Sequence, residues 1–116
     1  FSCAALGALR DGTLDMCMED GVTPLAWSPL AGGRIATGQG VRTELLETLD
    51  EIANREGTSR VAVAIAFVLA HPSDAVALVG TQQPERLADI MNATRVSLSR
   101  ADAYRIVQAS DGVPLP

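Results

Sequence analysis

Two segments of the chain combine residue types that suit the binding of a flat, anionic ligand. The first segment ends an apolar run with the indole of Trp27, the hydroxyl of Ser28 and the glycine pair Gly32 and Gly33. An indole can stack on a flat ring, a hydroxyl can donate to a phosphate, and paired glycines let the backbone approach a pyrophosphate closely. Trp27 also has a plainer interpretation as a core residue, and Ser28 as a turn residue before a proline.

The second segment follows the apolar run at residues 75–79. It continues with Gly80 and Thr81 and then begins a helix at a proline. The first amides and the positive dipole end of a helix favour an anion, and Gln83 is a poor N-cap that leaves those amides to a ligand. Arg86 in the first turn would be the counter-charge to that ligand, although an exposed surface arginine is its plainer interpretation. Together the two segments predict a dinucleotide site that lacks the Rossmann fingerprint.

Composition limits the class of protein. The 116 residues suit one domain, and 47% hydrophobic residues are enough for an aliphatic core. A net charge of -5 argues against nucleic acid and against an anionic membrane as the partner. The apolar run from Val61 to Ala70 is about half the length of a membrane span. Since Cys3 and Cys17 are too few for a disulfide scaffold, we expect reduced thiols in a reducing compartment, the cytoplasm.

The chain offers few residues for catalysis. All nine basic residues are arginines, so no mechanism that needs a lysine amine is open to it. His71 precedes Pro72 at the expected end of a helix, and Tyr104 lies beside Ala103 where packing is expected. No Cys and His residues have metal-ligand spacing, and no carboxylate pair is set for acid–base work. The sequence therefore predicts no catalytic and no metal-binding residue.

Strands and helices alternate along the chain, and they must position the two segments. This alternation predicts a parallel sheet with crossover helices. The strands expected at 25–28 and 75–79 lack polar alternation, which indicates burial on both faces. The expected helices are an amphipathic one from Thr43 to Glu56, a buried one from Val61 to Ala70 capped by Thr58 or Ser59, one from Pro84 to about Thr94, and one capped by Ser99 that runs to Ala109.

Two other stretches are less regular. A short helix after Asp11-Gly12-Thr13 is predicted to carry Leu14, Cys17 and Met18 on one face, and the glycines between 32 and 40 predict a flexible loop. Phe1-Ser2-Cys3 is typical of the tail of a strand, and the chain begins without Met. Two strands cannot bury both faces of a sheet by themselves. We therefore expect the chain to be part of a larger protein.

Two motifs, in this order and at a fitting separation, carry a family resemblance. The first is Ala26-Trp27-Ser28-Pro29-Leu30-x-Gly32-Gly33-Arg34, and the second is Val79-Gly80-Thr81-x-x-Pro84-Glu85-Arg86-Leu87. Together they resemble the C-terminal third of the aldo-keto reductases, closest to a bacterial oxidoreductase branch, and the resemblance covers nearly the whole chain. It implies an α/β fold, a (β/α)8 TIM barrel of which residues 1–116 would be the C-terminal, cofactor-binding fragment with about strands seven and eight and their helices.

The resemblance also implies roles for single residues. Trp27 would stack on the nicotinamide, while Ser28 and Leu30 would line the diphosphate. Gly80 stands where many members have a lysine and Ile90 where many have an asparagine that contacts adenine, but Arg86 favours NADP(H) over NAD(H). The implied cofactor-binding set is Trp27, Ser28, Leu30, Gly32, Gly33, Arg34, Gly80, Thr81 and Arg86, the last three around the 2′-phosphate.

The activity implied for the parent protein is the reduction of aldehydes or ketones to alcohols with NAD(P)H. The catalytic Asp, Tyr, Lys and His of the family belong to earlier strands, so this chain alone is expected to be inactive. Its expected partners are a small carbonyl substrate and the rest of the barrel, supplied by N-terminal sequence or by another chain. One alternative is a non-catalytic nucleotide-binding or interaction module of the same family, and another is a structural α/β domain that binds nothing.

Overall fold

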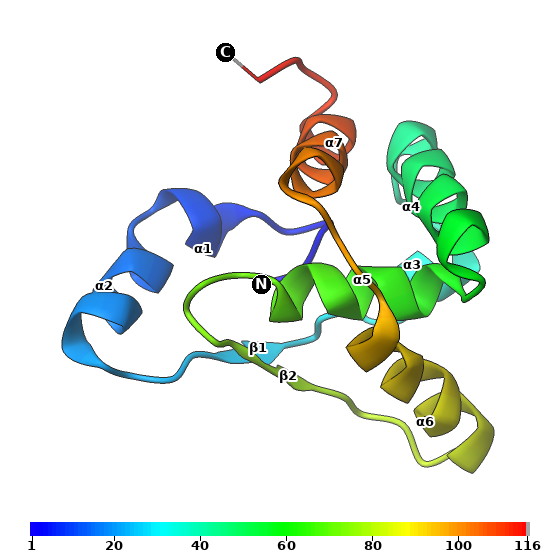
Figure 1. Ribbon diagram of the computed structural model, residues 1–116, viewed down its shortest axis with the longest axis horizontal. Coiled ribbons are helices and arrows are strands. Elements are labelled where there is room, and N and C mark those ends of the chain that lie inside the picture. The colour runs from blue at the N-terminus through cyan, green and yellow to red at the C-terminus, as the bar shows by residue number, and fades with distance from the viewer. Residues whose placement is uncertain (116) are drawn as a thin grey trace.

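The structure is a computed structural model and describes residues 1–115. Its sheet consists of two short strands, β1 (Leu25–Trp27) and β2 (Val76–Leu78). Figure 1 shows α5 lying against these strands, with α4 and α7 on the far side of α5 and α6 beyond the end of β2. The helices are α1 (Gly7–Arg10), α2 (Thr13–Asp20), α3 (Arg34–Thr37), α4 (Thr43–Glu56), α5 (Arg60–Leu69), α6 (Pro84–Met91), the 3-10 helix η1 (Asn92–Arg95) and α7 (Arg100–Asp111).

The two strands are parallel neighbours, as the alternation of elements predicts. Ala26 pairs with Ala77 at the centre of the register, and the Val76 amide donates to the carbonyl of Pro24 at 3.0 Å. Helices α3, α4 and α5 lie between the strands in the sequence. Because both strands run in the same direction, the loops that follow them leave the same end of the sheet.

The helix predictions at 43–56 and around residue 60 are confirmed. α4 has the predicted bounds, and its core face ends where Gly57 adopts a left-handed φ of 66°. Ser59 is the N-cap of α5, since its hydroxyl accepts a hydrogen bond from the Ala62 amide at 3.1 Å. Every side chain from Ala62 to Val68 is buried, so α5 is enclosed on all sides.

In the described chain each strand is covered on one face only, so the burial on both faces that the sequence indicates depends on the further sequence expected above. Ala26 is 4% exposed, but Leu25 is 62% and Trp27 80% exposed, and in β2 Val76 and Leu78 are exposed as well. Successive side chains of a strand point to opposite faces, and α5 covers only one face. The other face has no described element packed on it (Figure 1).

Several shorter expectations also need correction. The stretch with four glycines between 32 and 40 includes the helical turn α3, and Met18 is exposed, because only Leu14 and Cys17 of α2 point inward. The helix that begins at Pro84 changes to the 3-10 helix after Met91. Residues 1–3 form no strand; Ser2 pairs with Ala5 in an isolated bridge instead.

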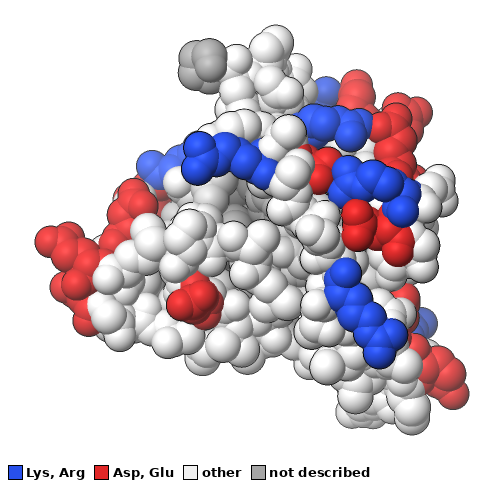
Figure 2. Space-filling model, viewed as in Figure 1, with Lys and Arg blue, Asp and Glu red and all other residues white. Residues whose placement is uncertain are grey.

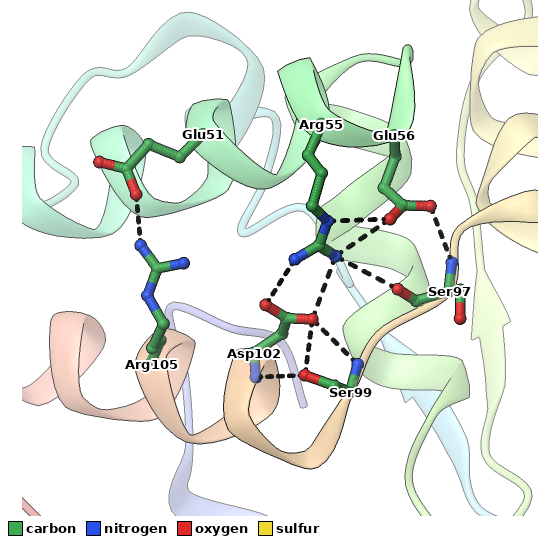
Figure 3. Close-up of polar contacts among 7 residues, drawn as sticks. All are labelled: Glu51, Arg55, Glu56, Ser97, Ser99, Asp102 and Arg105. Atoms are coloured by element: carbon green, nitrogen blue, oxygen red, sulfur yellow. Dashed lines mark hydrogen bonds and ion pairs between the residues drawn. The ribbon is translucent and has the colours of Figure 1, made fainter.

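A polar network joins the C-terminal end of α4 to the N-terminal end of α7 (Figure 3). The Arg55 guanidinium donates to both carboxylate oxygens of Asp102, at 2.9 and 3.0 Å, and also to Glu56 and to the Ser97 carbonyl. Asp102 and Ser99 form a capping box, in which the Ser99 amide and hydroxyl donate to Asp102 Oδ2 at 2.9 and 2.8 Å. The network therefore links the end of α4 to residues 97–99, which lead into α7.

The Arg55 guanidinium beside Asp102, with the Ser99 donors, holds the pKa of that buried carboxyl well below its usual range. A carboxylate with a lowered folded-state pKa stabilises the fold at every pH above its unfolded-state pKa, which is about 3.9. The stabilisation is lost only as the pH falls below that value and through the lowered pKa of the folded state.

We expect Asp102→Asn to lower the free energy of unfolding by about 2–3 kcal/mol at neutral pH, because hydrogen bonds to a charged group are lost. The difference from the unchanged protein should shrink as the pH falls below about 4, where Asp102 itself becomes protonated. Urea unfolding at neutral and acid pH measures both effects.

Glu51→Gln is the matched control, because Glu51 pairs with Arg105 between the same two helices but on the exposed surface (Figure 3). Exposed pairs contribute little, so this change should cost about 0.5 kcal/mol or less. If Glu51→Gln lowered the free energy of unfolding as much as Asp102→Asn does, the buried network would contribute no more to stability than the exposed ion pair.

Candidate functional site

The loops that follow β1 and β2 enclose a cleft of about 690 Å³ at the C-terminal ends of the strands. Trp27 and Arg86 both line it, so the two segments with binding chemistry meet in space. A volume of this size is typical of a small-molecule site. The lining residues are Trp27, Ser28, Pro29, Leu30, Gly32, Gly33, Ala36, Thr37, Val61, Leu78, Val79, Gly80, Thr81, Arg86, Asp89 and Ile90.

On the β1 side the strand ends in an exposed indole and a tight turn. The Trp27 side chain is exposed in the described chain in spite of its size. Ser28 has a φ of 54°, and its Oγ accepts a hydrogen bond from the Gly32 amide at 2.9 Å. The hydroxyl thus closes the turn through its lone pair and keeps its own proton for a further acceptor.

The glycine pair gives the turn an open backbone. Gly32 and Gly33 have φ values of 68° and 84°, in the left-handed region that glycine adopts without strain. A Cβ built at either position would meet no atom within 4 Å, so the space over the backbone is empty. This is the accessibility that the glycine pair predicts.

Arg34 lies outside the residues that line the cleft. Its Nε donates to the carbonyl of Ala31 at 2.9 Å, because the guanidinium turns back along its own loop. A second arginine, Arg60, contacts α3 and α4 next to this wall of the cleft. Arg60 donates to the carbonyl of Ile35 in α3 at 3.3 Å and pairs with Asp50 of α4, and the pairing raises the pKa of Arg60 and lowers that of Asp50.

The β2 side carries the predicted anion-binding features. The Thr81 hydroxyl accepts from the Gln83 amide at 3.2 Å, and Gln83 is the N-cap of α6 without a side-chain cap bond. Gly80 precedes Thr81 in the same loop and also lines the cleft. The Arg86 side chain makes no hydrogen bond and no ion pair with any residue of the described chain, 1–115. A guanidinium without a partner at the rim of a cleft is available to an anionic ligand.

Asp89, which neither sequence motif includes, is a second charged residue of the cleft lining. Its Oδ2 accepts a hydrogen bond from the Ser59 hydroxyl at 2.8 Å. Spacing could have found it, because Asp89 lies three residues after Arg86 and therefore on the same side of α6. Val61 of α5 and the buried Ile90 of α6 add the apolar part of the lining.

Other reactive side chains lie outside this cleft. His71 Nδ1 is 2.9 Å from the Ser73 hydroxyl and accepts from the Ser73 amide at 3.2 Å. Tyr104 is 52% exposed, so the expectation that it packs is wrong. Cys3 and Cys17 are free and buried, and burial raises the pKa of the Cys3 thiol to about 12, which leaves it a poor nucleophile at neutral pH.

Residues 1–115 contain no group of three or more side chains placed to hold a metal ion and no helix that is long and apolar enough to cross a membrane. Figure 2 shows acidic side chains gathered over α2 and mixed charges over α4 and α7.

Comparison with known proteins gives one family. The sequence profile of the Aldo/keto reductase family matches residues 9–111. A 6-dehydroglucose reductase of Novosphingobium aromaticivorans is 38% identical over 112 residues, which are 96% of this chain and 37% of that protein. An uncharacterized oxidoreductase of Bacillus subtilis, YcsN, is 34% identical over 100% of this chain and 39% of its own length. The chain thus spans little more than a third of these relatives.

Solved structures agree. A thermostable aldo-keto reductase, solved in complex with the inhibitor epalrestat, superposes with a TM-score of 0.82 at 28% identity over 94% of this chain and 37% of its own. The aldose reductase of Giardia lamblia gives a TM-score of 0.66 at 26% identity over 92% of this chain and 35% of its own. The chain belongs to the aldo/keto reductase family and has the fold of part of that family's TIM barrel.

Proposed function

We propose that residues 1–116 are the cofactor-binding C-terminal part of an NAD(P)H-dependent reductase of aldehydes or ketones. The observation that carries the proposal is the cleft that brings the exposed indole of Trp27 and the unpaired guanidinium of Arg86 together. Catalytic loops of β/α barrels cluster at the C-terminal ends of the strands, and the cleft opens at that end. Family membership supports the same assignment.

The residues of the cleft fit a nicotinamide dinucleotide. The lining of the cleft includes a large aromatic face, an open glycine backbone and an arginine, the residue types that suit a flat ring, a diphosphate and a further phosphate. Leu30, Val61 and Ile90 add apolar side chains to the same lining. Arg34 is the one member of the implied set that faces away from the cleft.

Each polar group then has a stated task. The Trp27 ring would stack on the nicotinamide, and the Ser28 hydroxyl, which accepts from the Gly32 amide and so closes the turn, would donate to the diphosphate. Arg86 binds the 2′-phosphate. When bound, the cofactor supplies a hydride for the carbonyl carbon. The proton for the carbonyl oxygen comes from a tyrosine outside this chain.

NADP(H) is the cofactor that we propose in preference to NAD(H). Arg86 supplies a charge for the 2′-phosphate, even though Gly80 and Ile90 replace a lysine and an asparagine that many relatives carry. The absence of a competing ion pair on Arg86 in the described chain supports this preference.

The rest of the barrel is the proposed partner of the bare sheet. Leu25, Val76 and Leu78 are exposed on short strands that have no further neighbours among residues 1–115. Uncharged strand edges of this kind pair with further strands. A small carbonyl compound is the proposed substrate, and the cytoplasm the proposed location.

If Arg86 reads the 2′-phosphate, Arg86→Ala in the intact protein should weaken NADPH by about 1.5–3 kcal/mol, or one to two decades in the dissociation constant, because a hydrogen bond to a charged group is lost. NADH should change far less. Calorimetric titration with both dinucleotides measures this, and Arg100→Ala, an exposed arginine outside the cleft, is the control. Equal weakening of both dinucleotides would show that Arg86 does not read the phosphate.

The turn after β1 gives a second prediction. Ser28→Ala removes the acceptor for the Gly32 amide and should cost about 1 kcal/mol of stability together with a comparable part of the affinity for both dinucleotides. Asparagine tolerates left-handed φ and carries a side-chain acceptor, so Ser28→Asn should lose less of both. Thermal unfolding and dinucleotide titration test the pair, and a larger loss from the asparagine variant would contradict the role given to the turn.

The 116-residue chain alone should reduce no aldehyde or ketone with NADH or NADPH, because it supplies no lysine and no tyrosine at the end of a strand. The intact protein, assayed beside it by cofactor oxidation, should be active. If the pure chain showed turnover, and a substitution within the chain abolished it, the catalytic residues would lie in this chain and the prediction would be wrong. An intact protein that binds the dinucleotides but reduces no carbonyl compound would favour the non-catalytic nucleotide-binding module.

A further inference from the structure

A hydroxyl outside the predicted cofactor-binding set links the buried helix α5 to the wall of the cleft. Ser59 accepts a hydrogen bond from the Ala62 amide as the N-cap of α5. The same hydroxyl donates to Oδ2 of Asp89, at 2.8 Å, and Asp89 lines the cleft. Because α5 is enclosed in the core, Ser59 is a fixed point, and it orients the Asp89 carboxylate.

Asp89 and Arg86 lie three residues apart on α6, and both line the cleft. Opposite charges at this spacing are neighbours on a helix surface and attract one another. No ion pair between them occurs in the described chain, where the carboxylate is bonded to Ser59 instead. The bond to Ser59 is therefore in competition with a pair that would neutralise Arg86.

We propose that Ser59 is a positioning residue that sets the preference of the cleft for the phosphorylated cofactor. By holding Asp89, Ser59 keeps the carboxylate away from Arg86 and leaves the guanidinium to the 2′-phosphate of NADP(H). This inference rests on the proposed function of the cleft. Without the serine hydroxyl, the carboxylate turns to Arg86, competes with the phosphate for it and repels the phosphate by its own charge.

The test is the ratio of the dissociation constants of NADPH and NADH for the intact protein, measured by calorimetric titration. Ser59→Ala should raise the NADPH constant roughly fivefold, the size of one unit-charge repulsion at contact distance in a well-screened site. The NADH constant should stay within about twofold. Ser59→Thr keeps the hydroxyl and should keep the ratio of the unchanged protein.

A second substitution separates charge from packing. Adding Asp89→Asn to Ser59→Ala should restore the ratio, because the neutral amide neither pairs with Arg86 nor repels the phosphate. Ser59→Gly serves if Ser59→Ala folds poorly, since glycine is a far better N-cap than alanine and also lacks the hydroxyl. It should give the same NADPH-selective loss.

Ser99→Ala is the matched control for the loss of a helix cap. Ser99 caps α7 through the Asp102 amide at 3.1 Å and does not line the cleft. Its removal should lower the melting temperature and leave the ratio of the two constants unchanged.

Three results would overturn the inference: equal weakening of both dinucleotides by Ser59→Ala, no recovery in the double variant, or the same shift in ratio from Ser99→Ala. Failure of the proposed function looks different. In that case neither dinucleotide binds, or Arg86→Ala leaves the ratio unchanged in the protein that retains Ser59.

Discussion

Helix α5 is apolar on every face, and the positions of the other elements follow from the need to cover it. All side chains from Ala62 to Val68 are buried, and burying each of the large ones stabilises the fold by about 1.5–3 kcal/mol. α4 covers one side, β2 another, and α6 with η1 a third, while α3 packs near the start of the helix. Figure 1 shows these elements arranged around α5, and α3, α5 and α6 each contribute residues to the lining of the cleft.

The polar start of α5 completes this arrangement. Two consecutive residues reach opposite walls of the cleft, since Ser59 bonds to Asp89 on α6 and Arg60 bonds to the Ile35 carbonyl in α3. The next residue, Val61, lines the cleft itself. One turn of backbone therefore fixes the spacing between the diphosphate side and the phosphate side of the proposed site. A sequence reader sees Ser59 only as a helix cap, because its second bond goes to a residue thirty positions away.

What the sequence predicted well was local. The bounds of α4, the cap of α5 and the capping box of α7 all depend on neighbours within a few residues, and so does the helix start at Pro84. The parallel pairing of the strands followed from the order of elements. Burial of Leu25 and Val76 could not be decided in this way, because it depends on what packs on the second face of the sheet. Spacing along α6 places Asp89 on the side of Arg86, but its bond to Ser59 is a tertiary contact that spacing does not show, whereas the loop motifs could be read as contiguous residues.

The turn after β1 contains two non-glycine residues in the left-handed backbone region. Ser28 and Ala31 both have a φ of 54° although neither is glycine, and each costs of order 1–2 kcal/mol in that region. Strain alone does not mark a site, since Asp74 has a φ of 52° and lies outside the cleft. At the turn, however, the strained residues precede Gly32 and Gly33, and the Ser28 hydroxyl accepts a hydrogen bond from the Gly32 amide. The turn brings the Ala31 amide to the Ser28 carbonyl at 2.9 Å, and its glycine backbone lies open at the cleft that Trp27 also lines, where we propose the diphosphate and the stacked ring.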